Sequence, residues 1–281
     1  MKRVSSLHRE TFRRGSRTYY NSSIFFPRSV RDDVYVLYGF VRLADDFVDS
    51  TPQDADGFQS FVESYRRALG SGRSGRRTVD DPIIDPFVRL QDRLGFRQEW
   101  IDAFLCSMEM DLTRKVYGTI EETLAYIYGS AEVIGLFMAR LLGLPEQSHS
   151  CAMMQGRAMQ YINFIRDLDE DRALGRTYLP LAGSGLESLS PDAAHAKPEL
   201  YRRYVRDQVA RYLEWQTEAR KGYRFIPRRY RIPIKTASDM YSWTASRIAR
   251  DPFVVFRRQV KPAKGRVILS ALWNVIRAQR R

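Results

Sequence analysis

Residues 160–180 read QYINFIRDLDEDRALGRTYLP, and four polar side chains recur at helical spacing within them. Gln160, Asn163, Asp167 and Asp171 are three, four and four residues apart, so a helix places all four on one face. Most side chains between them are apolar enough to be buried. A polar stripe on an otherwise apolar helix is costly unless it meets partners. We therefore expect this stripe to form a binding site.

Asp167 and Asp171 lie one helical turn apart, where two carboxylates repel each other. We expect a positive group between them. Oxygen-only ligands favour Mg²⁺, which typically takes one or two carboxylates together with substrate phosphates. For an isolated pair of this kind, a solvated acidic helix end is the simpler interpretation. The polar stripe that leads into the pair, and a second pair upstream, favour the metal site.

The second pair lies in a helix predicted over about residues 28–50, between two prolines. The polar members of this helix stand at i, i+4, i+7 and i+11, which is again one face: Tyr38, Arg42, Asp45 and Asp49. Arg42 is one turn from the carboxylates. It is therefore placed to pair with them or with a bound phosphate.

Composition limits the class of protein. The chain has 281 residues, of which 44% are hydrophobic, and strand-like alternation is scarce, so we expect an all-α protein. Two cysteines make no disulfide framework, and a chain with three histidines is not expected to hold zinc. The N-terminus has no apolar run of the signal-peptide type, and we find no stretch of about 18 apolar residues. These features predict a cytoplasmic protein without a membrane span.

Helical periodicity extends over most of the chain. Predicted helices cover about 28–50, 53–70, 81–94, 97–114, 119–143, 147–173, 199–222, 235–250, 252–260 and 265–279. Between them we expect a basic loop at 70–77, a loop at 182–198 and a basic turn at 227–233. Asp111 and Arg114 are interpreted as a simple charge pair at a helix end. Gly129 and Gly135, inside a predicted helix, indicate close approach of either another helix or a ligand.

The formal net charge of +13 favours a polyanionic partner: nucleic acid, anionic lipid or a phosphorylated substrate. The basic residues are scattered and show no nucleic-acid recognition motif, so we do not expect nucleic-acid binding. The last helix, 265–279, has apolar residues on one side and is surrounded by Arg266, Arg277, Arg280 and Arg281. It is interpreted either as a membrane-surface helix or as a helix that caps the core.

Two helical aspartate pairs that face each other across an apolar bundle suit one particular chemistry. Several Mg²⁺ ions held by the carboxylates would grip a diphosphate and help it to leave an allylic carbon. Apolar, aromatic walls would then protect the carbocation from water. Faces of tyrosine and phenylalanine rings stabilise such positive charge by roughly 0.5–2 kcal/mol each.

The chain resembles the squalene/phytoene synthase family over about residues 10–265. Residues 38–49, YGFVRLADDFVD, resemble the first aspartate motif of that family, and 160–171 followed by 175–180 resemble the second. The resemblance implies a single-domain, all-α isoprenoid-synthase bundle, residues 1–281, around a central apolar cavity. Residues 1–26 would form an N-terminal segment covering the site, and 265–281 a basic amphipathic C-terminal helix.

The resemblance also implies roles for individual residues. Mg²⁺, which Mn²⁺ can replace, would be bound by Asp45, Asp49, Asn163, Asp167 and Asp171. Arg42 and Tyr38 would join the four aspartates in catalysis. Substrate would be bound by Ser16, Tyr19, Phe40, Tyr128, Gln160, Asn163, Arg166 and Tyr241, with Tyr38, Phe40 and Tyr128 as cavity-wall residues.

The implied reaction joins two identical allylic diphosphates head to head. We favour two geranylgeranyl diphosphates giving phytoene through prephytoene diphosphate, the first step of carotenoid biosynthesis, without NADPH. The alternatives are dehydrosqualene or squalene synthesis from farnesyl diphosphate, the latter with NADPH, and a non-catalytic family member. The basic surface is interpreted as peripheral contact with an anionic membrane, and oligomeric state is left open.

Glu132 stands where the family often has a glycine, on a helix expected to line the cavity. Three roles inside the cavity are open to such an acid: it narrows the space, binds a basic neighbour, or accepts the final proton. The alternative is that it points away from the cavity toward an arginine. The choice affects the length of substrate that fits but leaves the core chemistry unchanged.

Overall fold

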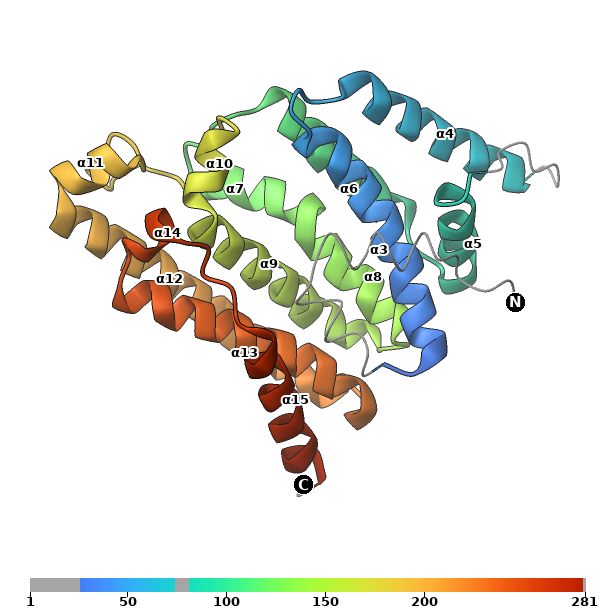
Figure 1. The fold of residues 1–281 in the computed structure, drawn as a ribbon. Helices are drawn as coiled ribbons and strands as arrows, with labels where there is room; N and C mark the ends of the chain where they lie inside the picture. The colour runs from blue at the N-terminus through green and yellow to red at the C-terminus, as the bar shows by residue number, and fades with distance from the viewer. Residues whose placement is uncertain (1–25, 74–80, 280–281) are drawn as a thin grey trace.

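The computed structural model describes residues 26–73 and 81–279, and the fold is all-α, as predicted (Figure 1). In chain order the α-helices are α3 (Arg28–Asp49), α4 (Ala55–Arg73), α5 (Ile84–Leu94), α6 (Gln98–Thr113), α7 (Ile120–Ile127), α8 (Val133–Leu141), α9 (His149–Arg166), α10 (Leu168–Ala173), α11 (Pro191–Ala196), α12 (Pro198–Arg220), α13 (Arg228–Arg250), α14 (Val254–Arg257) and α15 (Lys264–Gln279). Shorter turns are the π-helical η1 (Tyr128–Glu132) and the 3₁₀-helical η2 (Glu146–Ser148) and η3 (Lys221–Phe225).

Helix α9 lies at the centre of the bundle. It packs against α12, α8, α13 and η1 (Figure 1). Buried apolar side chains form two clusters, one built mainly by α3 to α6 with α8, and the other by α7, α9, α10 and α12 to α14. The helix that carries the second aspartate motif therefore runs through the middle of the molecule, with the α3 motif on a neighbouring wall.

Several element boundaries differ from the sequence prediction. The expected helix 119–143 is interrupted by the π-helical turn η1, and the expected helix 147–173 breaks at Asp167, whose backbone (φ −99°, ψ 20°) leaves helical geometry. The turn predicted at 227–233 is wrong, because α13 begins at Arg228 and includes Pro233. Proline removes one helical hydrogen bond, and here α13 continues through it. The predicted loop 182–198 also contains α11.

The glycines of the predicted 119–143 helix serve close helix packing. A Cβ atom built on Gly129 would lie 2.0 Å from the carbonyl oxygen of Ala103 in α6. One built on Gly135 would lie 2.2 Å from the carbonyl oxygen of Ala152 in α9. Likewise, a Cβ atom built on Gly156 of α9 would lie 2.2 Å from the carbonyl oxygen of Ala131 in η1. Of the two alternatives left open by the sequence, the helix-packing one accounts for these contacts.

One helical stretch, Ile120–Leu141, is long and apolar enough to cross a membrane by length and composition, contrary to the sequence prediction. Of its most apolar 18-residue window, 56% is buried inside the fold. Core helices of globular proteins pass the same test, and α7, η1 and α8 pack against α6 and α9 in this way.

Gly129→Ala is expected to lower the free energy of unfolding by about 1–3 kcal/mol, because the added methyl group collides with backbone that cannot easily move. Gly70→Ala is the matched control. Gly70 is exposed in α4, and a Cβ atom added there would have nothing within 4 Å, so alanine should stabilise the helix by up to about 1 kcal/mol. Urea denaturation of both variants measures the difference. Equal stabilities would contradict the close-packing role.

Candidate active site

A largely apolar cavity of about 330 Å³ lies between α3, α9, α13 and the η1–α8 segment. On α3 its lining ends at Val41, and on α9 it ends at Asn163. Four residues further along, Asp45 on α3 and Asp167 at the end of α9 are the first aspartates of the two motifs. Both motifs therefore lie at the same end of the cavity, as the facing arrangement predicted from the sequence requires.

Arg42 holds the first motif. Its guanidinium group lies 2.7 Å from the carboxylate of Asp45 and 2.6 Å from that of Asp46. This confirms the pairing expected from helical spacing. Desolvation in the protein interior, followed by the neighbouring Asp49 carboxylate, raises the pKa of Asp45 to about 7. The negative charge of this helix face is therefore poorly stabilised until a cation joins it.

The second motif lies where α9 ends and α10 begins. Arg166 donates two hydrogen bonds to Asp167, and both side chains are mostly buried. Burial, followed by repulsion from Asp167, raises the pKa of Asp171 well above its usual value. Asp49 of the first motif also contributes to that shift, which indicates that the two motifs face each other across the end of the cavity.

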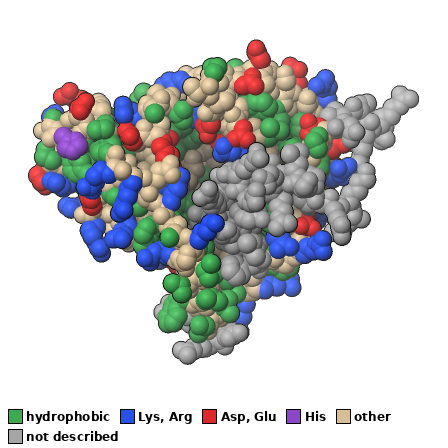
Figure 2. Space-filling view, viewed as in Figure 1, with side chains coloured by type: hydrophobic (Ala, Val, Ile, Leu, Met, Phe, Trp, Pro, Cys, Tyr) green, Lys and Arg blue, Asp and Glu red, His purple; other side chains and the backbone are tan. Residues whose placement is uncertain are grey.

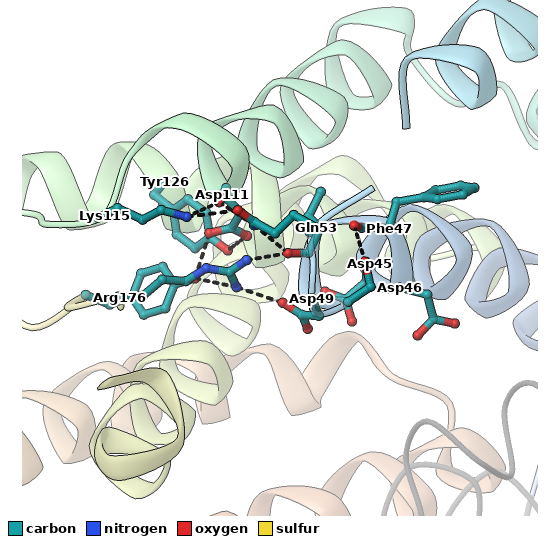
Figure 3. A network of polar contacts seen from close by, with 12 residues as sticks. Asp45, Asp46, Phe47, Asp49, Gln53, Asp111, Lys115, Tyr126 and Arg176 are labelled. Atoms are coloured by element: carbon teal, nitrogen blue, oxygen red, sulfur yellow. Dashed lines mark hydrogen bonds and ion pairs between the residues drawn. The ribbon is translucent and has the colours of Figure 1, made fainter. Parts of the chain in front are cut away.

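A buried network that sequence reasoning missed joins the first motif to Arg176, in the segment that follows the second motif (Figure 3). Asp111 of α6 accepts hydrogen bonds from the hydroxyl groups of Tyr126 and Tyr178, each at 2.6 Å. Arg176, which is only 4% exposed, lies beside this cluster and donates to the carboxylate of Asp49 at 2.7 Å. Burial raises the pKa of Asp111, while Arg176 and the two tyrosine hydroxyls act in the opposite direction.

Arg176 also fastens the end of α3 through the backbone. Its guanidinium group donates to the carbonyl oxygen of Val48 at 2.5 Å. Gln53 donates to the same carbonyl at 2.7 Å and to the carbonyl of Asp111 at 2.9 Å. The segment after α10 and the end of α6 thus fix the turn of α3 that carries Asp49 (Figure 3).

The interpretation of Asp111 and Arg114 as a helix-end charge pair was wrong. Asp111 is buried among tyrosines, whereas Arg114 pairs with Glu122 at 2.6 Å. The side chains of Asp111 and Arg114 do not share a helix face, because α6 ends at Thr113 and the backbone becomes extended at Arg114. The sequence signal that could have indicated this network is the motif Gly175–Pro180, which contains Arg176 and Tyr178 and follows closely after the second aspartate pair.

Three of the predicted substrate-contacting residues line the cavity: Tyr38, Gln160 and Asn163. Tyr241 is buried, and it is one of the groups that raise the pKa values of Tyr38 and Arg166, so it lies near both. Ser16 and Tyr19 lie outside the described residues. These positions bring most of the predicted set to the aspartate end of the cavity.

Phe40 and Tyr128 do not line the cavity, and their prediction as wall residues was wrong. Phe40 is fully buried on the other side of α3, stacked on Phe87 with ring centroids 3.7 Å apart. Two residues after Tyr38, it lies about 200° further round the helix. Tyr128 is exposed to solvent. In this segment the cavity lining begins only at Ser130.

A family model described as squalene/phytoene synthase matches residues 12–266. The chain belongs to the squalene/phytoene synthase family. It is 29% identical to the 15-cis-phytoene synthase of Paracoccus sp., over 96% of this chain and 91% of that protein. It is 28% identical to the presqualene diphosphate synthase of Zymomonas mobilis, over 93% of this chain and 89% of that protein. The chain is therefore a prenyltransferase similar to phytoene synthases, and prenyl diphosphates are its substrate class.

Solved structures share the all-α isoprenoid synthase fold. A dehydrosqualene synthase in complex with ligand superposes with a TM-score of 0.79 at 18% identity, covering 98% of this chain and 96% of that chain. Squalene synthase HpnC from Alicyclobacillus acidocaldarius superposes with a TM-score of 0.76 at 22% identity, covering 88% of this chain and 93% of that one.

The donors at the aspartate end of the cavity suit a hard divalent cation. They are carboxylate and amide oxygens, and Oδ1 of Asn163 is buried without a hydrogen-bond partner among the described residues. In that same part of the chain, no three Asp, Glu, His or Cys side chains converge closely enough to hold an ion by themselves. This arrangement fits Mg²⁺, which completes a small protein ligand set with substrate phosphates and water.

Glu132, the departure from the family pattern, points away from the cavity. It is buried, and its carboxylate lies 2.6 Å from Nε of Arg157. The guanidinium group of Arg157 in turn lies over the ring of Trp215, 5.5 Å from its centroid. Of the roles considered, only pairing with an arginine agrees with this position, so Glu132 does not shape the cavity in this family member.

Arg176→Met is expected to lower the free energy of unfolding by about 3–5 kcal/mol, because it leaves the buried Asp111 and the partly exposed Asp49 without their counter-charge. Arg176→Lys should recover only part of the loss, since lysine cannot reach Asp49 and the Val48 carbonyl with one planar group. Arg172→Ala is the control. Arg172 pairs with Asp169 on the surface, where an ion pair contributes little. Urea denaturation of all three variants checks this, and equal effects at positions 172 and 176 would contradict it.

Proposed function

We propose that this enzyme joins two molecules of geranylgeranyl diphosphate head to head, giving phytoene through prephytoene diphosphate, the first step of carotenoid biosynthesis. The observation that carries the proposal is the pair of facing aspartate motifs at one end of a long apolar cavity. The likeness to a 15-cis-phytoene synthase over 96% of the chain supports the choice of substrate.

The charged end of the cavity is suited to bind diphosphate. Asp45, Asp49, Asn163, Asp167 and Asp171 would hold Mg²⁺, and Mn²⁺ could replace it. When bound, the metal neutralises the charge on the leaving diphosphate and so makes its departure easier. Arg42 and Arg166, now paired with aspartates, lie where they can exchange a carboxylate for a diphosphate oxygen. Ser16 and Tyr19 of the N-terminal segment are proposed to contact a diphosphate as well.

The apolar part of the cavity is suited to hold the hydrocarbon tails. Along α9 its lining runs from Cys151 to Asn163, a separation of twelve positions and therefore roughly 18 Å of helix. Apolar side chains on this wall and the facing walls, including Met138, Met159 and Ile234, exclude water from the reacting carbons. Such a channel suits an extended polyprenyl chain better than a compact substrate.

Tyr38 stands at the junction of the two parts. Burial raises its pKa, so the phenol stays neutral at physiological pH. A neutral ring beside the reacting carbon stabilises a carbocation through its face rather than by removing a proton. Two ionisations are needed in the proposed reaction, one to form the cyclopropylcarbinyl diphosphate and one to rearrange it. Tyr38 would serve in both.

The second candidate is condensation of two farnesyl diphosphates. The 28% identity to a presqualene diphosphate synthase favours it. This reaction would use the same charged end of the cavity, and its substrate has a shorter hydrocarbon tail. NADPH would be needed only if the product were squalene.

A product assay separates these candidates. With Mg²⁺ present, geranylgeranyl and farnesyl diphosphate are supplied separately, each with and without NADPH, and the hydrocarbon is extracted and identified. We expect phytoene from geranylgeranyl diphosphate without NADPH. A presqualene, dehydrosqualene or squalene product formed only from farnesyl diphosphate would overturn the choice of substrate.

Asp45→Ala and Asp167→Ala are each expected to lower turnover by about a hundredfold or more while the protein stays folded, because each removes charge that must meet the leaving diphosphate. Asp169→Ala is the matched control. Asp169 lies in the same acidic segment but points to Arg172 on the surface. Its loss should leave turnover nearly unchanged. Full activity in either Asp45→Ala or Asp167→Ala would refute the assignment of the site.

A further inference from the structure

Helix α15 presents its largest apolar side chains to solvent. Its outer face consists of side chains that are 44–69% exposed: Ile268, Leu269, Leu272, Trp273 and Ile276. These follow one another at i, i+1, i+4, i+5 and i+8, so they form one continuous stripe. They account for five of the nine large exposed apolar residues in the described chain, which makes the outer face a patch rather than a scatter.

The inner face of α15 is the more polar one. Asn274 is buried and donates to the hydroxyl of Thr236 at 3.2 Å and to Asp239 at 3.0 Å, both on α13. Val267 and Ala271 complete the contact. A helix on a water-exposed surface normally turns its large apolar residues inward. The hydrogen bonds of Asn274 fix the opposite rotation, so the exposure of the outer face is built into the packing.

Positive charge lies at the start of the outer face. Lys261, Lys264 and Arg266 are exposed there. The guanidinium group of Arg266 also stacks over the ring of Trp243 in α13, 4.9 Å from its centroid. The first turn of α15 is therefore cationic on the side that faces solvent.

Positive charge also lies beyond the far end of the outer face. Ser270 donates to Asp239, and Asn274 donates to the earlier residue Thr236, so α15 runs antiparallel to α13. The far end of α15 therefore points toward the beginning of α13. Further arginines are exposed in that region: Arg224, Arg228 and Arg229.

Figure 2 shows the same arrangement, with apolar side chains on the projecting helix and Lys and Arg side chains around its base. The whole chain carries a formal net charge of +13. An apolar stripe flanked by cationic side chains is complementary to a bilayer with anionic headgroups, which offers acyl chains beneath a negative surface.

The inner side of α13 connects this face with the cavity. Pro233, Ile234 and Ala237 line the cavity, while the adjacent Thr236 contacts α15. One helix thus separates the exposed stripe from the space proposed to hold hydrocarbon tails. A membrane lying against α15 would bring that wall of the cavity close to the lipid.

We propose that the outer face of α15 docks this enzyme on the surface of an anionic lipid bilayer. The stripe enters the boundary between headgroups and acyl chains, and the flanking lysines and arginines meet the anionic headgroups. The proposal goes beyond the proposed function and does not depend on which prenyl diphosphate is used. Vesicle binding is measured without substrate, so a failure here is distinguishable from a failure of the product assay.

The test is sedimentation of the full chain with vesicles of equal parts phosphatidylcholine and phosphatidylglycerol, and with vesicles of phosphatidylcholine alone. We expect binding to the anionic vesicles that weakens at high salt. The double variant Leu269→Ser/Trp273→Ser should bind at least about tenfold more weakly, because two large side chains no longer enter the interface. Leu213→Ser, at an exposed apolar position on α12, is the matched control and should bind like the unaltered protein.

Thermal melting and turnover with detergent-dispersed substrate verify that the double variant is folded. Two outcomes would overturn the proposal. One is equal vesicle binding by the double variant and the unaltered protein, or none by either. The other is a dimer in solution that the double variant dissociates, without vesicle binding, since a second copy of the chain would then cover the outer face.

Discussion

The ion pair between Arg176 and Asp49 lies where the negative charge of both aspartate motifs converges. Asp111 is buried nearby and Asp171 is partly buried; burial raises the pKa of each, and repulsion from Asp167 raises that of Asp171 further. Buried carboxylates without counter-charge would destabilise the helices that carry them. Arg176 therefore neutralises the interior end of the site, while Arg42 and Arg166 neutralise its edges. The remaining negative charge faces the cavity, where a cation and a diphosphate can complete it.

The sequence predicts residues well where the partners lie within one or two helical turns. The spacing of Arg42 and Asp45 is sufficient to predict their ion pair, and the stripe through Gln160 and Asn163 is sufficient to place both on the cavity wall. Arg176 and Asp49 are 127 positions apart, and no local pattern joins them. The role of Arg176 arises only when α6, α3 and the segment after α10 meet.

The wrong predictions of residues in the cavity wall have a geometric origin. Phe40 belongs to the same quoted motif as Tyr38, but a motif does not specify which face of a helix each residue occupies. Two positions turn a side chain to the opposite face, so Phe40 packs with Phe87. Tyr128 is the first residue of the π-helical turn η1 and stands two positions before Ser130, where the cavity lining of this segment begins. Helical periodicity assumes a regular helix, and this one is not regular.

Close backbone packing and a break at the end of α9 shape the end of the cavity that carries the aspartates. Close approach of backbones at Gly135 and Gly156 lets α8, η1 and α9 meet without bulky side chains between them, and both glycines also border the cavity. At the end of α9, the backbone leaves helical geometry at Asp167 and restarts as α10. The backbone hydrogen bonds from Asp167 to Asn163 and from Asp171 to Asp167, each 2.8 Å long, continue across the break. Asp171 therefore stays one turn beyond Asp167, near Asp49 of the first motif.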